Sequence, residues 1–287
     1  MTSLSIPPFV STAELAARLG DPGVVVLDAS WYMPQSGRDA RAEFEAAHLP
    51  GARFFDLDEV SDASSPLPHT LPTPGAFEAA MRALGVGRGS LVVVYDGSGT
   101  NMSAPRAWWM FRHFGHAAVS VLDGGSKAWQ REGRPMERSL RTVPPGDFTA
   151  GPSLEAVRTA EQLGAALAAG SAEVVDARSA GRYRGTDPEP RAGLASGHMP
   201  GALNLPYAEL VDGNGLALPR EAVRERLARA GLSFQTPVIA SCGSGVTACV
   251  LLHALARVGH EARALYDGSW TEWASRGLPI ATGEAPR

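Results

Sequence analysis

The chain has 287 residues, which corresponds to one large domain or to two domains of ordinary size. Hydrophobic residues make up 44% of it and charged residues 20%, a globular composition that excludes a disordered chain. The formal net charge is -4, so the chain has no basic field for nucleic acid or for an anionic membrane surface.

The first residues, MTSLSIPPFVSTAEL, have neither the basic start nor the apolar core of a signal peptide. No apolar run approaches the ~20 residues that a membrane-spanning helix needs. We therefore expect a cytoplasmic protein that has neither a membrane nor a nucleic acid as a partner.

Helices and short apolar strands alternate along the chain. Residues 11–19 are predicted to form a helix that begins with a capping box, and residues 24–27 a strand. A strand at 91–95 leads through a glycine-containing turn into a helix at 104–114, and a strand follows at 119–122. The second half repeats this order at residues 159–168, 173–175, 238–240, 246–258 and 262–265, and its first helix also begins with a capping box, from Thr159 to Gln162. The alternation predicts α/β domains with mostly parallel sheets, in which ligands bind beyond the carboxyl ends of the strands.

Short motifs recur between the two halves in a constant order. The segment HLPGARF at His48 returns as HMPGALN at His198, and VLDGGSKAW returns later as LYDGSWTEW. The offsets between the copies drift from 144 to 150 positions, which indicates duplication into two similar domains rather than a solenoid. Segment 139–153 contains Pro and Gly and is typical of a linker, which predicts one domain at 1–138 and another at 154–287.

The two copies differ at the turn after their central apolar strand, where Asp96 in the first copy stands in the place of Cys242 in the second. The small residues Gly243, Ser244 and Gly245 let the backbone curl around the sulfur. Several N–H groups and the start of the next helix would then point at it and favour a thiolate. Cys242 is therefore a candidate nucleophile, although burial as a small apolar residue is the commonest state of a free cysteine.

Several other chemistries do not fit this turn. It lacks the GxxxxGK[ST] lysine of a P-loop, and Ala248 stands where a cysteine phosphatase needs an arginine. Cys249 is too far from Cys242 for a CxxC pair and is expected in the core, and GSGTNM in the first copy fails the GxGxxG pattern. Two cysteines and scattered histidines indicate neither a disulfide framework nor a metal site. Sulfur transfer or another thiolate chemistry remains.

The duplicated HxPGA segment, the DGG/DGS-x-x-x-W ending and the CGSGVT loop resemble a two-domain rhodanese-type sulfurtransferase over essentially the whole chain. Thiosulfate sulfurtransferases of that family typically carry cationic CRKGVT-like loops, whereas CGSGVT is the pattern of 3-mercaptopyruvate sulfurtransferases. The stretch GRYRGTDPEPR at 181–191 is similar to GRFRGTEPEPR of the same subfamily. The resemblance implies two tandem rhodanese-like domains, a non-catalytic one followed by a catalytic one.

The resemblance also implies which residues bind the substrate. Arg182 and Arg191 match the arginines that bind the carboxylate and keto end, and a guanidinium can hold a carboxylate with two parallel hydrogen bonds. Arg184 is a weaker candidate, because it would point the other way on an extended chain.

Three further residues match the family's Ser-His-Asp arrangement, namely Ser244, His69 and Asp58. In that arrangement the Asp orients the His, and the His moves a proton through the Ser. The resemblance further implies that backbone N–H groups of the loop stabilise a persulfide, at Gly243, Ser244, Gly245, Val246 and Thr247.

The implied activity is transfer of sulfur from 3-mercaptopyruvate through a Cys242 persulfide to an acceptor, with release of pyruvate. We expect thioredoxin, a small thiol or cyanide as the acceptor, and neither a metal nor an organic cofactor. A thiosulfate sulfurtransferase is the alternative within the family, disfavoured because the loop has no cation beside Cys242. A non-catalytic rhodanese-like binding module is the alternative of another class. Such modules usually lose the cysteine, as the first copy has done at Asp96.

Overall fold

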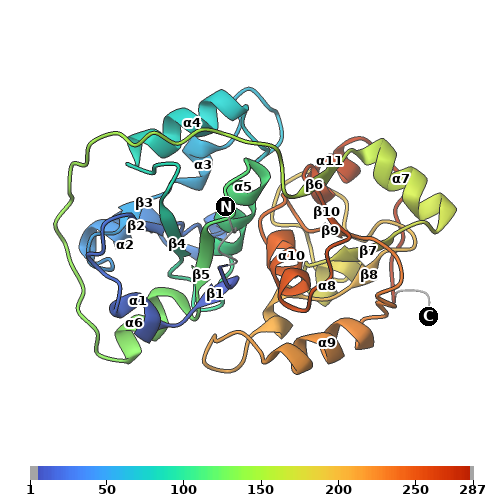
Figure 1. Ribbon diagram of the computed structural model, residues 1–287. Coiled ribbons are helices and arrows are strands. Elements are labelled where there is room, and N and C mark those ends of the chain that lie inside the picture. Colours follow the sequence, from blue (N-terminus) through green and yellow to red (C-terminus); the bar gives the residue numbers. More distant parts are fainter. Residues whose placement is uncertain (1–5, 285–287) are drawn as a thin grey trace. The chain divides into compact units, whose positions relative to one another are not determined.

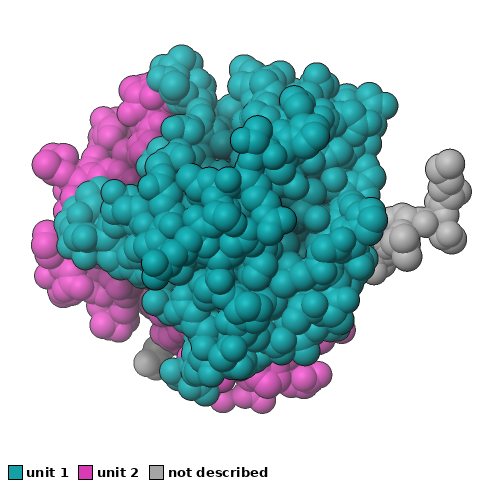
Figure 2. Space-filling model, turned by 90° about the vertical axis from the view of Figure 1, so that its left-hand side faces the viewer, with its two compact units in different colours: residues 1–64, 71–154, 213–217 teal, residues 65–70, 155–212, 218–287 magenta. Residues whose placement is uncertain are grey.

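The computed structural model describes residues 6–284, which form two compact units coloured separately in Figure 2. The first unit comprises the residues up to 64, residues 71–154 and residues 213–217. The second comprises residues 65–70, 155–212 and those from 218 onward. Two short segments, 65–70 and 213–217, therefore pack with a different unit from the residues that flank them in the sequence.

Residues 139–154, which include the predicted linker, form neither helix nor strand and are drawn in yellow-green in Figure 1. This segment belongs to the first unit, where the Phe148 N–H donates to the Val86 carbonyl at 3.1 Å. The Phe148 side chain is buried and lies edge-on to Phe77, with ring centroids 5.5 Å apart. The segment is thus fixed along the first unit.

A five-stranded parallel sheet, in the order β1-β5-β4-β2-β3, forms the centre of the first unit (Figure 1). Its strands are β1 (Phe9–Val10), β2 (Val24–Asp28), β3 (Arg53–Phe54), β4 (Leu91–Tyr95) and β5 (Val119–Leu122). The helices are α1 (Thr12–Ala16), η1 (Pro34–Ser36), α2 (Ala40–Ala46), α3 (Leu57–Val60), α4 (Pro74–Ala83), α5 (Ala104–His113) and α6 (Gly125–Arg131). Val26 and Val93 of the sheet pack in one buried cluster with Leu15, Phe44 and Trp129 of the flanking helices.

The second unit has the same topology, with a parallel sheet in the order β6-β10-β9-β7-β8. Its strands are β6 (Ala156–Arg158), β7 (Glu173–Asp176), β8 (Leu203–Asn204), β9 (Val238–Ser241) and β10 (Arg263–Tyr266). The helices are α7 (Ala160–Ala169), α8 (Ala180–Arg184), η2 (Tyr207–Leu210), α9 (Arg220–Arg229), α10 (Ala248–Arg257) and α11 (Ser269–Ser275). The predicted α/β class with parallel sheets is confirmed, and the two sheets carry the same strand order.

The repeated HxPGA segment has a structural role in both units. Nδ1 of His48 hydrogen-bonds to the Phe44 carbonyl at 2.8 Å, and Nδ1 of His198 to the Tyr183 carbonyl at 2.9 Å. Each imidazole also stacks on the ring of the same partner, with centroids 4.2 and 3.8 Å apart. Both histidines are buried, so the motif ties a helix to the strand that follows it.

Two local predictions are wrong. The helix after the cysteine turn begins at Ala248 rather than at 246, because Gly245 has a φ of 79° and the chain is still turning there. The stretch with Arg182 and Arg184 is a short helix, α8, rather than an extended chain. The Pro-rich residues that follow it hid this single helical turn from the sequence pattern.

Both predicted capping boxes are present at the starts of α1 and α7. Ser11 Oγ accepts from the Glu14 N–H at 3.2 Å, and the Glu14 carboxylate accepts from the Ser11 N–H at 2.8 Å. Thr159 and Gln162 repeat the same pair of bonds at 3.3 and 3.0 Å. Each box satisfies backbone donors that the first turn of a helix leaves unpaired.

We expect Ser11→Ala and Thr159→Ala each to lower the unfolding free energy of its own unit by about 1 kcal/mol. Two units need not unfold as one, so urea titration should be followed by hydrogen exchange and mass spectrometry of peptides from each unit. Ser11→Thr and Thr159→Ser keep the capping oxygen and serve as controls. A change confined to the other unit would contradict the assignment.

Candidate active site in the second unit

Cys242 follows β9, the central strand of the second sheet. All four residues of β9 are buried, and Cys242 itself is 2% exposed. Strands β10 and β7 lie parallel on either side, so the turn after β9 is at the carboxyl edge of the sheet, where such sheets bind ligands. The chain then turns at Gly245 and enters α10 at Ala248. The sulfur is thus carried between a strand end and a helix start.

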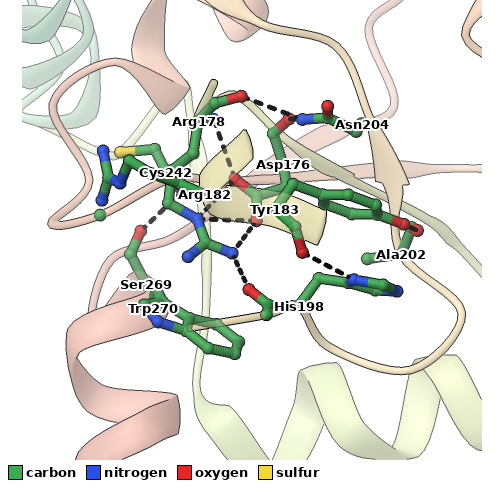
Figure 3. A network of polar contacts seen from close by, with 12 residues as sticks. Asp176, Arg178, Arg182, Tyr183, His198, Ala202, Asn204, Cys242, Ser269 and Trp270 are labelled. Carbon is green, nitrogen blue, oxygen red and sulfur yellow. Dashed lines mark hydrogen bonds and ion pairs between the residues drawn. The ribbon is translucent and has the colours of Figure 1, made fainter. Parts of the chain in front are cut away.

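The start of α11 holds the backbone on both sides of the sulfur-bearing residue. The Cys242 N–H donates to Ser269 Oγ at 3.2 Å (Figure 3), and the Trp270 N–H donates to the Cys242 carbonyl at 2.9 Å. The Gly243 carbonyl accepts from the N–H and the hydroxyl of Thr271 at 3.0 and 2.7 Å. These bonds fix Cys242 and Gly243 relative to the helix.

A hydroxyl and an imidazole meet two residues beyond the cysteine. Ser244 Oγ lies 2.8 Å from Nδ1 of His69, and both residues are buried. His69 comes from segment 65–70, which packs with the second unit, and its φ of 61° puts it in the left-handed region. An imidazole at this distance can exchange a proton with a hydroxyl, so the pair is suited to general acid–base chemistry.

Two guanidinium groups lie beside Gly243. A Cβ placed on Gly243 would be 3.1 Å from Nη2 of Arg182 and 3.5 Å from Nη1 of Arg191. Arg182 comes from α8, and Arg191 from the loop that follows it. Two cations next to the residue after Cys242 form a site for a small carboxylate or another anion.

Arg182 belongs to a chain of ion pairs. Its Nε and Nη2 donate to the two carboxylate oxygens of Glu189 at 3.1 and 2.6 Å. Glu189 also accepts from Nη1 of Arg178 at 2.7 Å, and Arg178 pairs with Asp176 at the end of β7 (Figure 3). The side chains of Asp176, Arg178 and Glu189 are at most 2% exposed, so each charge is compensated inside the protein.

In the first unit, Asp96 takes the place of Cys242 after β4. Its carboxylate is buried and accepts from the N–H groups of Ser98, Ser103 and Ala104 at 2.9, 3.0 and 2.9 Å. Backbone N–H groups of the turn and of the first turn of α5 therefore surround an anion. The Ser98 hydroxyl also donates to this carboxylate, so the turn holds negative charge with three main-chain donors and one side-chain donor.

The first unit has different side chains beside the glycine that follows Asp96. A Cβ on Gly97, the counterpart of Gly243, would lie 2.6 Å from the hydroxyl of Tyr32. That hydroxyl donates to Glu43 at 3.0 Å, and the guanidinium of Arg38 lies over the Tyr32 ring at 3.6 Å. The first unit therefore presents the Tyr32 hydroxyl to the Cα side of this glycine, and Nη2 of Arg38 donates to the Gly97 carbonyl at 3.1 Å.

The carboxyl groups of the aspartates at the ends of β2 and β7 have different partners. Asp176 pairs with Arg178, whereas Asp28 accepts from the N–H of Ser30 at 2.9 Å and also from its hydroxyl. Burial raises the pKa of Asp28 from its ordinary value of 3.8 to about 6. The first unit thus carries a titratable carboxyl where the second carries a fixed ion pair.

Two sequence-predicted residues do not join the group beside the cysteine within the second unit. Asp58 lies on α3 of the first unit and is exposed, so its role in orienting His69 stays a prediction. Arg184 forms an exposed ion pair with Glu284 at 2.7 Å.

The sequence analysis missed two residues that shape the site. Glu189 lies inside the quoted stretch GRYRGTDPEPR, where an acidic residue between two arginines was the available signal. Ser269 stands in the second DGS motif where the first copy has Gly125 in DGG, and this difference between the copies was also visible.

Within residues 6–284, no three His, Cys, Asp or Glu side chains gather where they could hold a metal ion. In the same part of the chain, every helix is too short or too polar to cross a membrane.

The chain is similar to several known proteins over most of its length. The family model described as Rhodanese-like domain matches twice, at residues 11–132 and 159–276. The 3-mercaptopyruvate sulfurtransferase of Escherichia coli (strain K12) is 44% identical over 274 residues, 95% of this chain and 97% of that protein. The thiosulfate sulfurtransferase of Gallus gallus is 42% identical over 273 residues, 94% and 93% of the two chains. The solved structure of SseA from Escherichia coli, titled as a 3-mercaptopyruvate sulfotransferase, has a TM-score of 0.85 at 41% identity, covering 92% of this chain and 99% of that one.

The raised pKa of Asp28 makes the stability of the first unit depend on pH. The folded state binds this proton more tightly than the unfolded chain, so the unfolding free energy falls as pH rises from about 4 to about 6. A shift from 3.8 to about 6 corresponds to about 3 kcal/mol. Asp28→Asn keeps an acceptor for Ser30 without a charge, and we expect it to be the more stable form above pH ~6.

Chemical unfolding of the first unit at about pH 5 and about pH 8 measures this effect. Asp176→Asn serves as the comparison, since it leaves the buried Arg178 without its full partner and should destabilise the second unit at both values. Equal pH dependence in the wild type and in Asp28→Asn would rule out this carboxyl as the source.

Proposed function

The chain belongs to the family of rhodanese-like domain proteins, with one domain in each half, and we propose that it is a 3-mercaptopyruvate sulfurtransferase that works through a persulfide on Cys242. The observation that carries the proposal is the pair of guanidinium groups, Arg182 and Arg191, beside Gly243. A donor whose carboxylate binds these cations would bring its sulfur to the neighbouring Cys242. The Escherichia coli relative that bears this name covers nearly the whole chain.

In the first half-reaction, the Cys242 thiolate attacks the sulfur of 3-mercaptopyruvate. The S–S bond forms as the donor's C–S bond breaks, and pyruvate leaves as its enolate. The thiol proton of the donor passes through Ser244 and His69 to the enolate carbon, so the step consumes no net proton. The 2.8 Å contact between Ser244 Oγ and His69 Nδ1 supports this relay.

The loop N–H groups from Gly243 to Thr247 stabilise the persulfide anion that results. The support for this step is the first unit, where the same turn surrounds the Asp96 carboxylate with backbone donors. Fixed main-chain dipoles need no rearrangement when the charge develops, which is why they are effective in catalysis.

In the second half-reaction, an acceptor thiolate attacks the outer sulfur, and the Cys242 thiolate leaves. Thioredoxin or a small thiol is the acceptor that we propose in the cell, and cyanide serves in vitro, where it becomes thiocyanate. We place this reaction in the cytoplasm, where thiols are kept reduced. Neither half-reaction requires a redox cofactor, because the sulfur moves by displacement at each step.

Thiosulfate is the alternative donor, since the Gallus gallus relative is named for it. The residues from Gly243 to Thr247 carry no cation, so the charge at the site comes from arginines on and after α8. Two guanidinium groups from separate positions suit a donor with a carboxylate and a keto oxygen. We therefore favour the keto acid.

Treatment with 3-mercaptopyruvate in the absence of an acceptor should add one sulfur atom to the peptide that contains Cys242, as read by mass spectrometry. Cys242→Ser should neither gain the sulfur nor release pyruvate, because a hydroxyl does not replace the thiolate as a nucleophile. Cys249→Ser is the matched control and should keep the activity, since Cys249 is buried in α10. Pyruvate release by Cys242→Ser would exclude the proposed mechanism, and a chain without any persulfide would be a binding module.

The choice of donor is tested by comparing kcat/KM for 3-mercaptopyruvate and thiosulfate with cyanide as the common acceptor. We expect at least about a tenfold preference for 3-mercaptopyruvate, which corresponds to about 1.4 kcal/mol of transition-state selectivity. The physical reason is that Arg182 and Arg191 contact both ends of the keto acid. A tenfold preference for thiosulfate would make the chain a thiosulfate sulfurtransferase.

A further inference from the structure

The carboxylate of Glu189 accepts hydrogen bonds from two arginines near the proposed donor site. Its Oε1 accepts from Nη1 of Arg178 at 2.7 Å and from Nε of Arg182 at 3.1 Å, while its Oε2 accepts from Nη2 of Arg182 at 2.6 Å. One carboxylate thus bridges two guanidinium groups. Its side chain is 2% exposed, so water does not compete for these bonds.

The bond pattern leaves one edge of Arg182 available. Glu189 occupies the edge formed by Nε and Nη2, and within residues 6–284 Nη1 of Arg182 has no hydrogen-bond partner. Arg182 is 21% exposed, and its Nη2 is the atom that faces Gly243. A planar guanidinium can bind a second carboxylate through Nη1 and Nη2 while the first edge remains paired.

Arg178, which donates to Glu189, is itself held by three contacts. Arg178 pairs with Asp176 through Nε at 2.9 Å and donates from Nη2 to the Gly197 carbonyl at 2.7 Å. Its guanidinium also lies over the Trp270 ring at 4.2 Å (Figure 3). These three contacts hold the guanidinium of Arg178, which in turn holds the carboxylate of Glu189.

We propose that Glu189 is a positioning residue that fixes Arg182 and presents its Nη1–Nη2 edge to the carboxylate of the donor. This inference rests on the proposed function, because it assigns Arg182 to the donor of that reaction. A free arginine side chain would lose about 2 kcal/mol of rotamer entropy when the donor binds, and Glu189 removes most of this cost beforehand.

Two effects of Glu189 on donor binding make opposite predictions for KM: its positioning of Arg182, and the repulsion between its negative charge and the anionic donor. Glu189→Gln removes a negative charge next to the donor site, so loss of this repulsion alone predicts tighter binding of the anionic donor and a lower KM. Loss of positioning predicts the reverse, because the amide has one acceptor oxygen where the carboxylate has two. If that oxygen takes the place of Oε1, the NH2 group faces Nη2 of Arg182, which is itself a donor. The direction in which KM changes therefore decides between the two.

The experiment measures pyruvate release from 3-mercaptopyruvate with cyanide as acceptor. We expect Glu189→Gln to raise KM about tenfold, or about 1.4 kcal/mol, and to change kcat by less than about threefold. Glu189→Asp keeps the charge on a shorter side chain and should recover part of the affinity. Arg184→Gln is the matched control, because it removes an arginine of the same helix whose ion pair with Glu284 is exposed, and it should leave KM unchanged.

A second measurement separates positioning from local unfolding. Iodoacetamide is neutral and needs no arginine, and the Cys242 thiolate displaces its iodide to form a thioether. Cys242 is 2% exposed, so opening of the loop would speed its alkylation strongly, whereas loss of positioning alone should leave the rate within about threefold. Thermal unfolding of each variant checks that the chain is folded at the assay temperature.

Each outcome decides the proposal. A raised KM with an unchanged alkylation rate supports it. An unchanged or lowered KM in Glu189→Gln, or a raised KM with alkylation more than about tenfold faster, overturns it, because the effect is then either absent or structural. If wild-type protein forms no persulfide from 3-mercaptopyruvate, the proposed function itself is wrong, and this inference falls with it.

Discussion

The structure depends on one turn that surrounds an anion with main-chain donors. A parallel sheet brings its central strand to an edge where the chain must reverse into a helix, and the reversal leaves backbone N–H groups that need acceptors. The first unit satisfies them with the Asp96 carboxylate, which accepts from Ser98, Ser103 and Ala104. The second unit carries Cys242 at that position, where the proposed persulfide anion would take backbone donors of the corresponding turn. The two copies thus place a carboxylate and a thiol at the end of the same strand of the fold.

The second unit has a longer loop beside its turn, and this loop carries the residues of the proposed donor site. Phe44 and His48, the stacked pair of the first unit, are four positions apart, whereas Tyr183 and His198 are fifteen apart. The additional residues carry Glu189 as well as the second arginine beside the turn. In the first unit Tyr32, Arg38 and Glu43 lie beside the corresponding glycine. The two halves thus share a scaffold and differ in the loop beside the turn.

Features that depend on hydrophobic periodicity and on neighbouring residues were predictable from the sequence. Capping residues, apolar strands and the recurring His and Trp motifs indicated two α/β domains, because each of these signals lies within a few consecutive residues. Residue patterns alone did not reveal that segment 65–70 packs with the second unit, since this is decided by long-range contacts, and only the family resemblance placed His69 with Ser244. Helix α8 was missed because its single turn is too short for a helical period. The partnership of Arg182 and Glu189 required the fold of the loop between them.

Backbone strain points to the same turn independently of any family resemblance. Within residues 6–284, four non-glycine residues have a positive φ, namely His69, Asn101, Phe234 and Ser269, and two of them, His69 at 61° and Ser269 at 49°, contact this turn. His69 contacts Ser244, and Ser269 accepts from the Cys242 N–H. The first unit has Gly125 in place of Ser269, with a φ of 54° at no steric cost. The second unit accepts strain of order 1–3 kcal/mol to place a hydroxyl there, and such strain persists where a side chain is needed in one position.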